Sequence, residues 1–169
     1  MRTAPHLFCV LVALGLAGAA HADPLAELSD SVTDLFSRAE NARAHARHCA
    51  GRPDADRVAL RDALAGWSHR NDAAGYDALM AALKDAAPGL AEQTDAAYAQ
   101  IDAAVAQQIA AKPQLCAGLP DRLKSDEFAL RPALRETRRT ARELGVRPAD
   151  KVPPRIEPGL AAAVQPLAQ

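Results

Sequence analysis

The sequence lacks the short motifs that mark several classes of enzyme and cofactor-binding protein. It has no C-x-x-C-H for covalent haem attachment and no C-x-x-C for thiol exchange. It also has no phosphate-binding glycine loop and neither of the hydrolase motifs G-x-S-x-G and H-E-x-x-H. Its carboxylates are scattered at helix-surface spacings, which do not pair them for acid–base catalysis. These absences favour a protein that is not an enzyme and that needs no cofactor.

Aromatic residues make up only 4% of the chain, apolar β-branched residues are few, and alanine dominates the composition. Alanine is the strongest helix former, whereas strands are enriched in β-branched and aromatic residues. The composition therefore predicts an all-α fold.

The chain has one sustained apolar run, at residues 7–16, and no second one. Arg2 precedes this run, and the tripeptide A-H-A at 20–22 matches the small-x-small site of signal cleavage. The run is shorter than the roughly 20 residues that a membrane-spanning helix needs. We therefore expect residues 1–22 to be a signal peptide and the mature chain to begin at Asp23. The mature protein would then be periplasmic or secreted, with no membrane span.

The mature chain carries little net charge, with 19 basic and 21 acidic residues from position 23 onward. A general nucleic-acid binder usually has a clear basic excess, so we expect no nucleic-acid partner. The charge is unevenly distributed. Residues 23–112 hold 9 basic and 14 acidic side chains, whereas residues 113–169 hold 10 and 7.

Apolar spacing predicts a helix over 24–50, in which apolar or small residues recur three and four positions apart. These residues are Leu25, Leu28, Val32, Leu35, Ala39, Ala42, Ala46 and Cys49. Residues 55–86 contain two apolar sets that are out of phase, which fits one kinked helix or two shorter ones. A further helix is expected over 90–111.

The last predicted helix begins at Ser125 or Leu130 and ends at Gly145. Together these segments predict an antiparallel up-down-up-down bundle of about four helices over residues 23–145. The remaining residues, 146–169, are rich in proline and show no apolar period, so we expect a mostly disordered tail.

Cys49 and Cys116 are the two cysteines of the mature chain, and export implies an oxidising compartment. In the predicted topology the first and third helices end at the same pole of the bundle, and the two cysteines lie at those ends. We expect them to form a disulfide bond. A reactive or metal-binding pair is the alternative.

His45 and His48 lie close to Cys49 on the first helix, about 40° and 100° from it around the helix axis. A zinc site would need two more ligands, and His69 lies roughly 20 Å from this pole in an antiparallel hairpin. We interpret the pair as a polar helix end, where positive charge complements the helix dipole. Weak metal binding by His45 and His48 with Asp54 or Asp56 is the alternative.

Four arginines of the last helix form a single stripe, within about 60° of arc. This arginine row consists of Arg131, Arg135, Arg138 and Arg142. Because residues 23–112 are net acidic, the row could pair with the acidic helices of its own bundle. The alternative is recognition of an acidic partner protein or of envelope phosphate groups.

The only tryptophan, Trp67, begins a W-x-x-R-N motif between the two cysteines. With its flanking cysteines, this motif resembles small exported helical proteobacterial proteins of unknown function. The resemblance implies a shared fold and transfers no active residue. Because Trp67 falls in phase with Leu60 and Leu64, we expect it to anchor the core rather than to stack on a ligand.

These observations predict an exported, non-catalytic helical bundle that binds another envelope macromolecule. Its partner would be a protein or an anionic envelope component, and its role that of an inhibitor, immunity factor or assembly factor. The alternatives are a bundle that binds a small molecule or metal, and a hydrolase without a recognisable motif.

Overall fold

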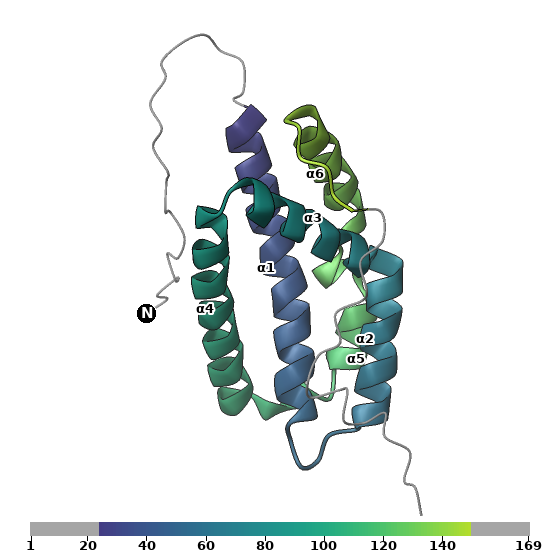
Figure 1. Ribbon diagram of the computed structural model, residues 1–169. Coiled ribbons are helices and arrows are strands. Elements are labelled where there is room, and N and C mark those ends of the chain that lie inside the picture. The colour runs from purple at the N-terminus through teal and green to yellow at the C-terminus, as the bar shows by residue number, and fades with distance from the viewer. Residues whose placement is uncertain (1–23, 150–169) are drawn as a thin grey trace, which may run out of the picture.

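The computed structural model describes residues 24–149, and all the regular structure in this range is helical (Figure 1). The α-helices are α1 (Pro24–Ala50), α2 (Arg57–Asn71), α3 (Ala73–Ala86), α4 (Gly89–Ala111), α5 (Leu119–Lys124) and α6 (Arg131–Glu143). Two 3₁₀ turns, η1 (Pro113–Leu115) and η2 (Asp126–Phe128), flank α5. The predicted signal peptide and residues 150–169 of the predicted tail lie outside the described residues. Within 24–149, no helix combines the length and apolar character that crossing a membrane requires.

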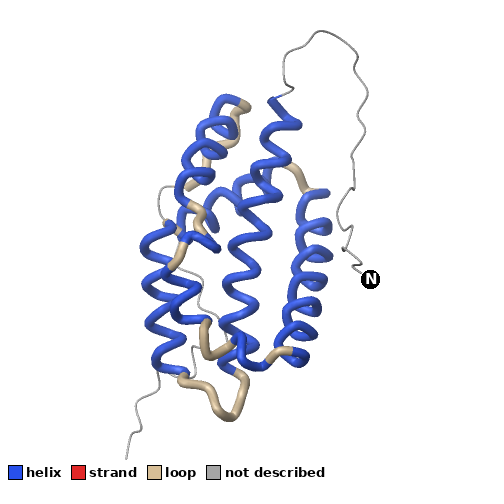
Figure 2. The backbone as a smooth tube through the Cα atoms, turned by 180° about the vertical axis from the view of Figure 1, so that it is seen from behind, coloured by secondary structure: helices blue, strands red, loops and turns tan. Residues whose placement is uncertain are grey.

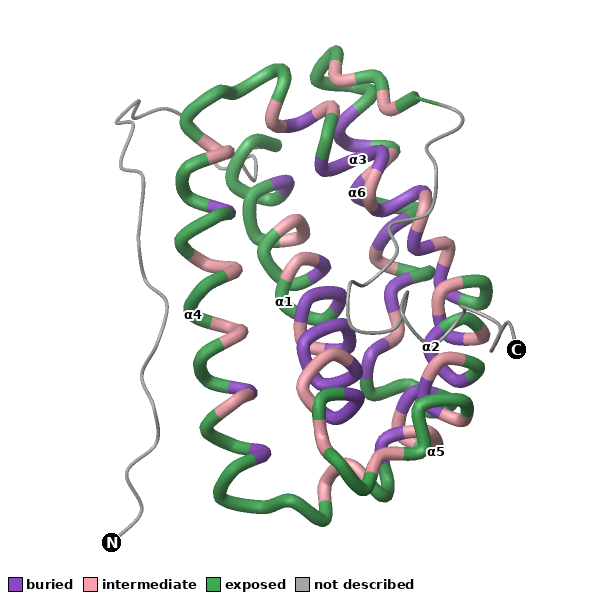
Figure 3. Tube along the Cα trace, turned by 60° about the horizontal axis from the view of Figure 1, so that its bottom comes forward, coloured by how far each residue is buried: buried purple, intermediate pink, exposed green. Residues whose placement is uncertain are grey.

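Helix α1 lies at the centre of the fold, between α4 on one side and α2, α5 and α6 on the other (Figures 1 and 2). Its small side chains allow this close packing, and from residue 39 to residue 50 it is buried on most of its circumference (Figure 3). The predicted apolar spacing is confirmed by the burial of Leu28, Leu35, Ala39, Ala42, Ala46 and Cys49, and Val32 is half-buried against the core. It is wrong for Leu25, which is 63% exposed.

The segment 55–86 forms two helices, because the chain turns at Asp72. This residue has φ 53° and ψ 49°, a left-handed conformation that aspartate adopts more readily than most residues. Its side chain caps α3 by accepting a hydrogen bond from the Gly75 backbone N–H at 3.2 Å. A Cβ on Gly75 would lie 2.2 Å from the Asp72 carboxylate, so any other residue there would displace this capping side chain. Helix α3 then runs obliquely from α2 to α4 (Figure 1).

The C-terminal segment contains two helices and two 3₁₀ turns where the sequence predicted one helix. Helix α5 has only six residues, which is too short for an apolar period to show. Pro120 and Pro132 stand in the first turns of α5 and α6, where the missing N–H costs nothing. Gly145, with φ 86°, follows the end of α6 as predicted. The described part therefore has six α-helices, rather than about four.

The predicted disulfide between Cys49 and Cys116 is present, with a Cα–Cα distance of 5.3 Å. It joins the last turn of α1 to the segment that follows α4. These two helix ends therefore lie at the same pole of the molecule, as the sequence predicted.

The W-x-x-R-N motif ties α2 to α5 and to the segment between α5 and α6. The Trp67 indole N–H donates to the Phe128 carbonyl, and an Arg70 guanidinium N–H donates to the Leu123 carbonyl, both at 2.9 Å. The Asn71 side-chain oxygen accepts from the Leu130 backbone N–H at 2.8 Å. Trp67 is fully buried, so its predicted role as a core anchor is confirmed. The motif is structural, because it satisfies backbone groups of a segment with little regular structure.

Candidate functional site

Three members of the arginine row, Arg131, Arg135 and Arg142, are exposed on α6. We call these three the outer arginines. The fourth, Arg138, is half-buried, and its guanidinium donates to the Asp72 carboxylate at 3.0 Å. The row is therefore divided, because Arg138 joins α6 to the α2–α3 turn while the outer arginines face solvent.

The outer arginines differ from most of the other arginines in the described part of the chain. Within residues 24–149, they have no side-chain hydrogen bond or ion pair, and exposed Arg147 shares this property. All arginines between residues 24 and 130 have such a partner: Arg38, Arg43, Arg47, Arg52, Arg57, Arg61, Arg70 and Arg122. The predicted pairing with the acidic helices therefore holds for Arg138 alone.

Arg139 lies beside the arginine row and is neutralised by its own helix. Its guanidinium pairs with Glu136 and Glu143, three and four residues away. The two carboxylates of α6 are therefore engaged by Arg139, which leaves the neighbouring outer arginines as a patch of one charge sign.

The two histidines near Cys49 point to different neighbours. His45 is buried, its Nδ1 lies 2.8 Å from the Asn41 carbonyl, and its ring packs against Phe128. The Nε2 atom of His48 lies 3.0 Å from the Asp102 carboxylate on α4. Among residues 24–149, no three His, Cys, Asp or Glu side chains are grouped so that they could hold a metal ion.

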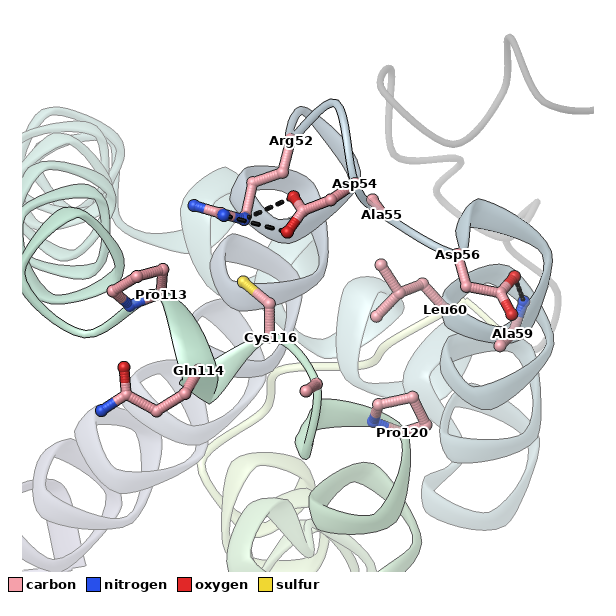
Figure 4. A pocket seen from close by; sticks show the side chains of 11 residues that line it. Arg52, Asp54, Ala55, Asp56, Ala59, Leu60, Pro113, Gln114, Cys116 and Pro120 are labelled. Carbon is pink, nitrogen blue, oxygen red and sulfur yellow. Dashed lines mark hydrogen bonds and ion pairs between the residues drawn. The ribbon is translucent and has the colours of Figure 1, made fainter.

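Asp54 and Asp56, the possible further metal ligands, belong to the loop between α1 and α2. Asp54 accepts two hydrogen bonds from the Arg52 guanidinium, at 3.0 and 3.1 Å, and Asp56 caps α2 by accepting from the Ala59 N–H (Figure 4). Together with Cys116 and Pro120, they border an open hollow at the disulfide pole. The charged groups at this hollow form hydrogen bonds within the loop and at the start of α2. They therefore stabilise the loop, and we assign no ligand to the hollow.

Burial lowers the pKa of the His45 imidazole, although the hydrogen bond to the Asn41 carbonyl opposes the change. A histidine whose pKa is lower in the folded state binds its proton more readily in the unfolded state. We therefore expect the stability to fall as the pH drops through the ordinary histidine value of about 6.5. Thermal unfolding at pH 7.5 and 5.5 should show a smaller loss for His45→Leu than for the wild type. The exposed control His69→Gln should behave like the wild type, and equal losses in all three proteins would contradict this role of His45.

A buried charge cluster, which the sequence analysis missed, connects α1 with α3. Arg43 is 3% exposed, and its guanidinium donates to both carboxylate oxygens of Asp77 at 2.8 Å. The same group donates to Glu40 at 3.1 Å, and Glu40 is also 3% exposed. Tyr76 lies beneath the guanidinium, with its ring centroid 5.5 Å away. Two carboxylates therefore share one buried cation.

The electrostatics of this cluster keep Arg43 charged. Burial by itself lowers the pKa of the guanidinium, but the hydrogen bond and charge of Asp77, with the charge of Glu40, outweigh it and raise the pKa. The bidentate geometry is one that arginine provides and lysine does not. The cluster therefore holds a fixed charge at the α1–α3 contact.

Beside this cluster lies a hollow of about 520 Å³ between α1, α3 and α4. We call it the tyrosine hollow, and its walls include Phe36, Glu40, Tyr76, Asp77, Met80 and Tyr98. No sequence motif marked it, because its residues come from three helices that are far apart in the chain.

Comparison with known proteins gives no relative from which a function could be transferred. No family model matches the chain, and neither a curated protein nor a solved structure is significantly similar to it. The resemblance carried by the W-x-x-R-N motif therefore stays a prediction, and any function has to be argued from the geometry.

Proposed function

We propose that this protein is an exported, non-catalytic bundle that binds the acidic surface of another envelope protein, as an inhibitor, immunity factor or assembly factor. Export rests on the predicted signal peptide at 1–22. We also keep the predicted up-down-up-down order of four segments. In this order α2 and α3 together form the second segment, and α5 and α6 together form the fourth. The observation that carries the binding function is the exposure of the outer arginines without a partner in residues 24–149.

The stability of α6 does not account for these arginines. Arg131 and Arg135 are four residues apart, as are Arg138 and Arg142, and like charges at this spacing destabilise a helix by about 0.2–0.5 kcal/mol. The buried residues Leu134, Thr137 and Ala141 fix the neighbouring face of α6 against the core. The outer arginines therefore stand on a rigid helix at regular spacing, and this arrangement supports recognition of an extended anionic surface.

Guanidinium groups suit carboxylates because each offers two parallel hydrogen bonds. Three of them on one helix face would bind several carboxylates of a partner at once. Exposed charges at such an interface mainly affect the association rate and specificity, and salt screens them. The proposal therefore predicts an interaction that weakens as the salt concentration rises.

The double substitution Arg131→Glu with Arg135→Glu tests this function. Both positions lie in the N-terminal half of α6, where negative charge favours the helix dipole, so melting should change little. Capture of exported-fraction proteins by chemical cross-linking should lose at least one salt-sensitive partner in the variant. The loss should be about tenfold or more, because two attractive contacts become repulsive.

The matched control is Arg38→Glu with Arg61→Glu, which makes the same charge change on α1 and α2. These arginines form exposed ion pairs with Asp34 and Asp62, which are worth about 0–1 kcal/mol each. The control should retain the captured partner. If the α6 variant remains folded and captures the same proteins as the control, the outer arginines are not the binding surface.

A further inference from the structure

His45 is a buried titratable residue that the proposed binding function does not use. It is 3% exposed on α1, and the centroid of its ring lies 5.9 Å from that of Phe128 in η2. The Asn41 carbonyl can only accept a hydrogen bond, so the neutral imidazole carries its proton on Nδ1, which lies 2.8 Å from that carbonyl. The unprotonated nitrogen, Nε2, is buried and has no hydrogen-bond partner within residues 24–149. A second proton on this ring would therefore make Nε2 a buried donor.

The groups around the imidazole come from α4, α5 and η2. Arg122 of α5 also contacts Phe128, with its guanidinium carbon 5.3 Å from the ring centroid, and its charge opposes a second proton on His45. Glu127 of η2 and the uncharged amide of Gln108 on α4 favour that proton. However, the Arg122 guanidinium already donates to both carboxylate oxygens of Glu127. The carboxylate that could stabilise a protonated His45 is therefore engaged by another cation.

Burial has the largest effect on the His45 pKa and lowers it, and the charge of Arg122 adds to this effect. The Asn41 carbonyl, Glu127 and Gln108 raise the pKa but do not outweigh burial. In a state where the ring reaches water, its pKa returns to the ordinary value of about 6.5. Acidification below this value therefore favours opening, because the open state binds the proton more readily.

The segment that His45 contacts, residues 119–130, is held from two sides. It contains α5 and η2, and it packs against both α1 and α2. Towards α2, the W-x-x-R-N motif forms three hydrogen bonds with this segment, through groups that do not titrate between about pH 5 and 8. Towards α1, the contact includes the ring pair of His45 and Phe128, and histidine changes its charge in this range. Acid therefore weakens the attachment to α1 and leaves the attachment to α2 intact.

We propose that His45 is a pH switch whose protonation releases residues 119–130 from α1 while the W-x-x-R-N motif holds them on α2. Release lets water reach the imidazole and uncovers part of the buried apolar surface of α5, which includes Leu119 and Leu123. Helix α5 then frays, because a helix of six residues is not stable without tertiary packing. The switch lies outside the outer arginines of α6 and does not rest on their proposed function.

Hydrogen exchange of the full mature chain, followed by nuclear magnetic resonance at pH 7.5 and 5.5, tests the switch. Protection factors are compared, since they account for the effect of pH on intrinsic exchange. The protection of the Arg122 and Leu123 amides should be about tenfold lower at pH 5.5, because a group with a pKa of about 6.5 in the open state changes from about 10% to about 90% protonated. Amides in the centres of α2 and α4 should keep their protection. A loss shared equally by all helices, or no loss in α5, would overturn the proposal.

Two variants assign the effect to His45. His45→Gln takes up no proton in this range, so its α5 protection should be the same at both pH values. The exposed control His69→Gln should repeat the tenfold loss of the wild type. Arg122→Gln frees Glu127 to pair with a protonated His45, so the loss should shrink to about two- or threefold even if this variant is less stable overall. This second variant decides the test if His45→Gln does not fold, and an undiminished loss in either variant contradicts the switch.

Discussion

Replacing Arg43 by methionine is expected to destabilise the fold by about 3–5 kcal/mol. The substitution keeps an apolar stem of similar length but removes the one cation that Glu40 and Asp77 share. Glu40 is 3% exposed and cannot turn to water, so its charge would remain buried without the guanidinium that pairs with it. Folded domains are stable by only about 5–15 kcal/mol, and the variant would therefore unfold at a much lower denaturant concentration.

Two further variants separate the lost charge pairing from the lost packing. Arg61→Met removes an arginine that pairs with exposed Asp62, and it should cost no more than about 1 kcal/mol. Combining Arg43→Met with Glu40→Gln and Asp77→Asn removes all three charges and should restore most of the stability, since no buried ion then lacks a partner. If Arg43→Met melts like Arg61→Met, or if the triple variant is no more stable than Arg43→Met, the cluster does not have this role.

The second large effect is expected on removal of the disulfide. Cys49 and Cys116 are 67 residues apart, and cross-linking a loop of this length stabilises the folded state by about 4 kcal/mol on the chain-entropy model. The variant Cys49→Ala with Cys116→Ala should therefore melt well below the wild type. Because the cysteines lie at the pole opposite the outer arginines (Figure 1), the variant should still bind a partner when it is folded.

Reduction provides the matched control for the disulfide. A reducing agent should lower the melting temperature of the wild type toward that of the double alanine variant, and it should leave the variant unchanged. Thiol labelling of the wild type without reductant should find no free cysteine. Quantitative labelling of both cysteines, with melting unaffected by reduction, would contradict the bond.

The parts of the fold that could be predicted from the sequence are those with long repeating patterns. Helix α1 spans Pro24–Ala50, as its apolar spacing indicated, because seven turns provide many repeats and proline and glycine mark the ends. Helix α5 and the two 3₁₀ turns could not be predicted, since each has too few residues for a period. In the sequence, the turn at Asp72 appears only as a change in the phase of the apolar residues. Such a change fits one kinked helix as well as two separate helices.

The candidate sites also differ in how far the sequence could predict them. The outer arginines could be located from their spacing, because a helix fixes the direction of every side chain. The buried cluster could not, since Glu40 and Arg43 have the three-residue spacing of an ordinary surface ion pair. Only the packing of α3 against α1 brings Asp77, 34 residues away, to the same guanidinium. The tyrosine hollow depends on three helices and left no local pattern.

The outer arginines are the centre of this account, and their accessibility in the complex is the most direct test. Phenylglyoxal modifies exposed arginines, and mass spectrometry reads each site separately. In the protein alone, Arg131, Arg135 and Arg142 should react readily. In the complex isolated from the exported fraction they should be protected, while exposed Arg38 on α1 should react as before. Full reactivity of all three outer arginines within an intact complex would contradict the account.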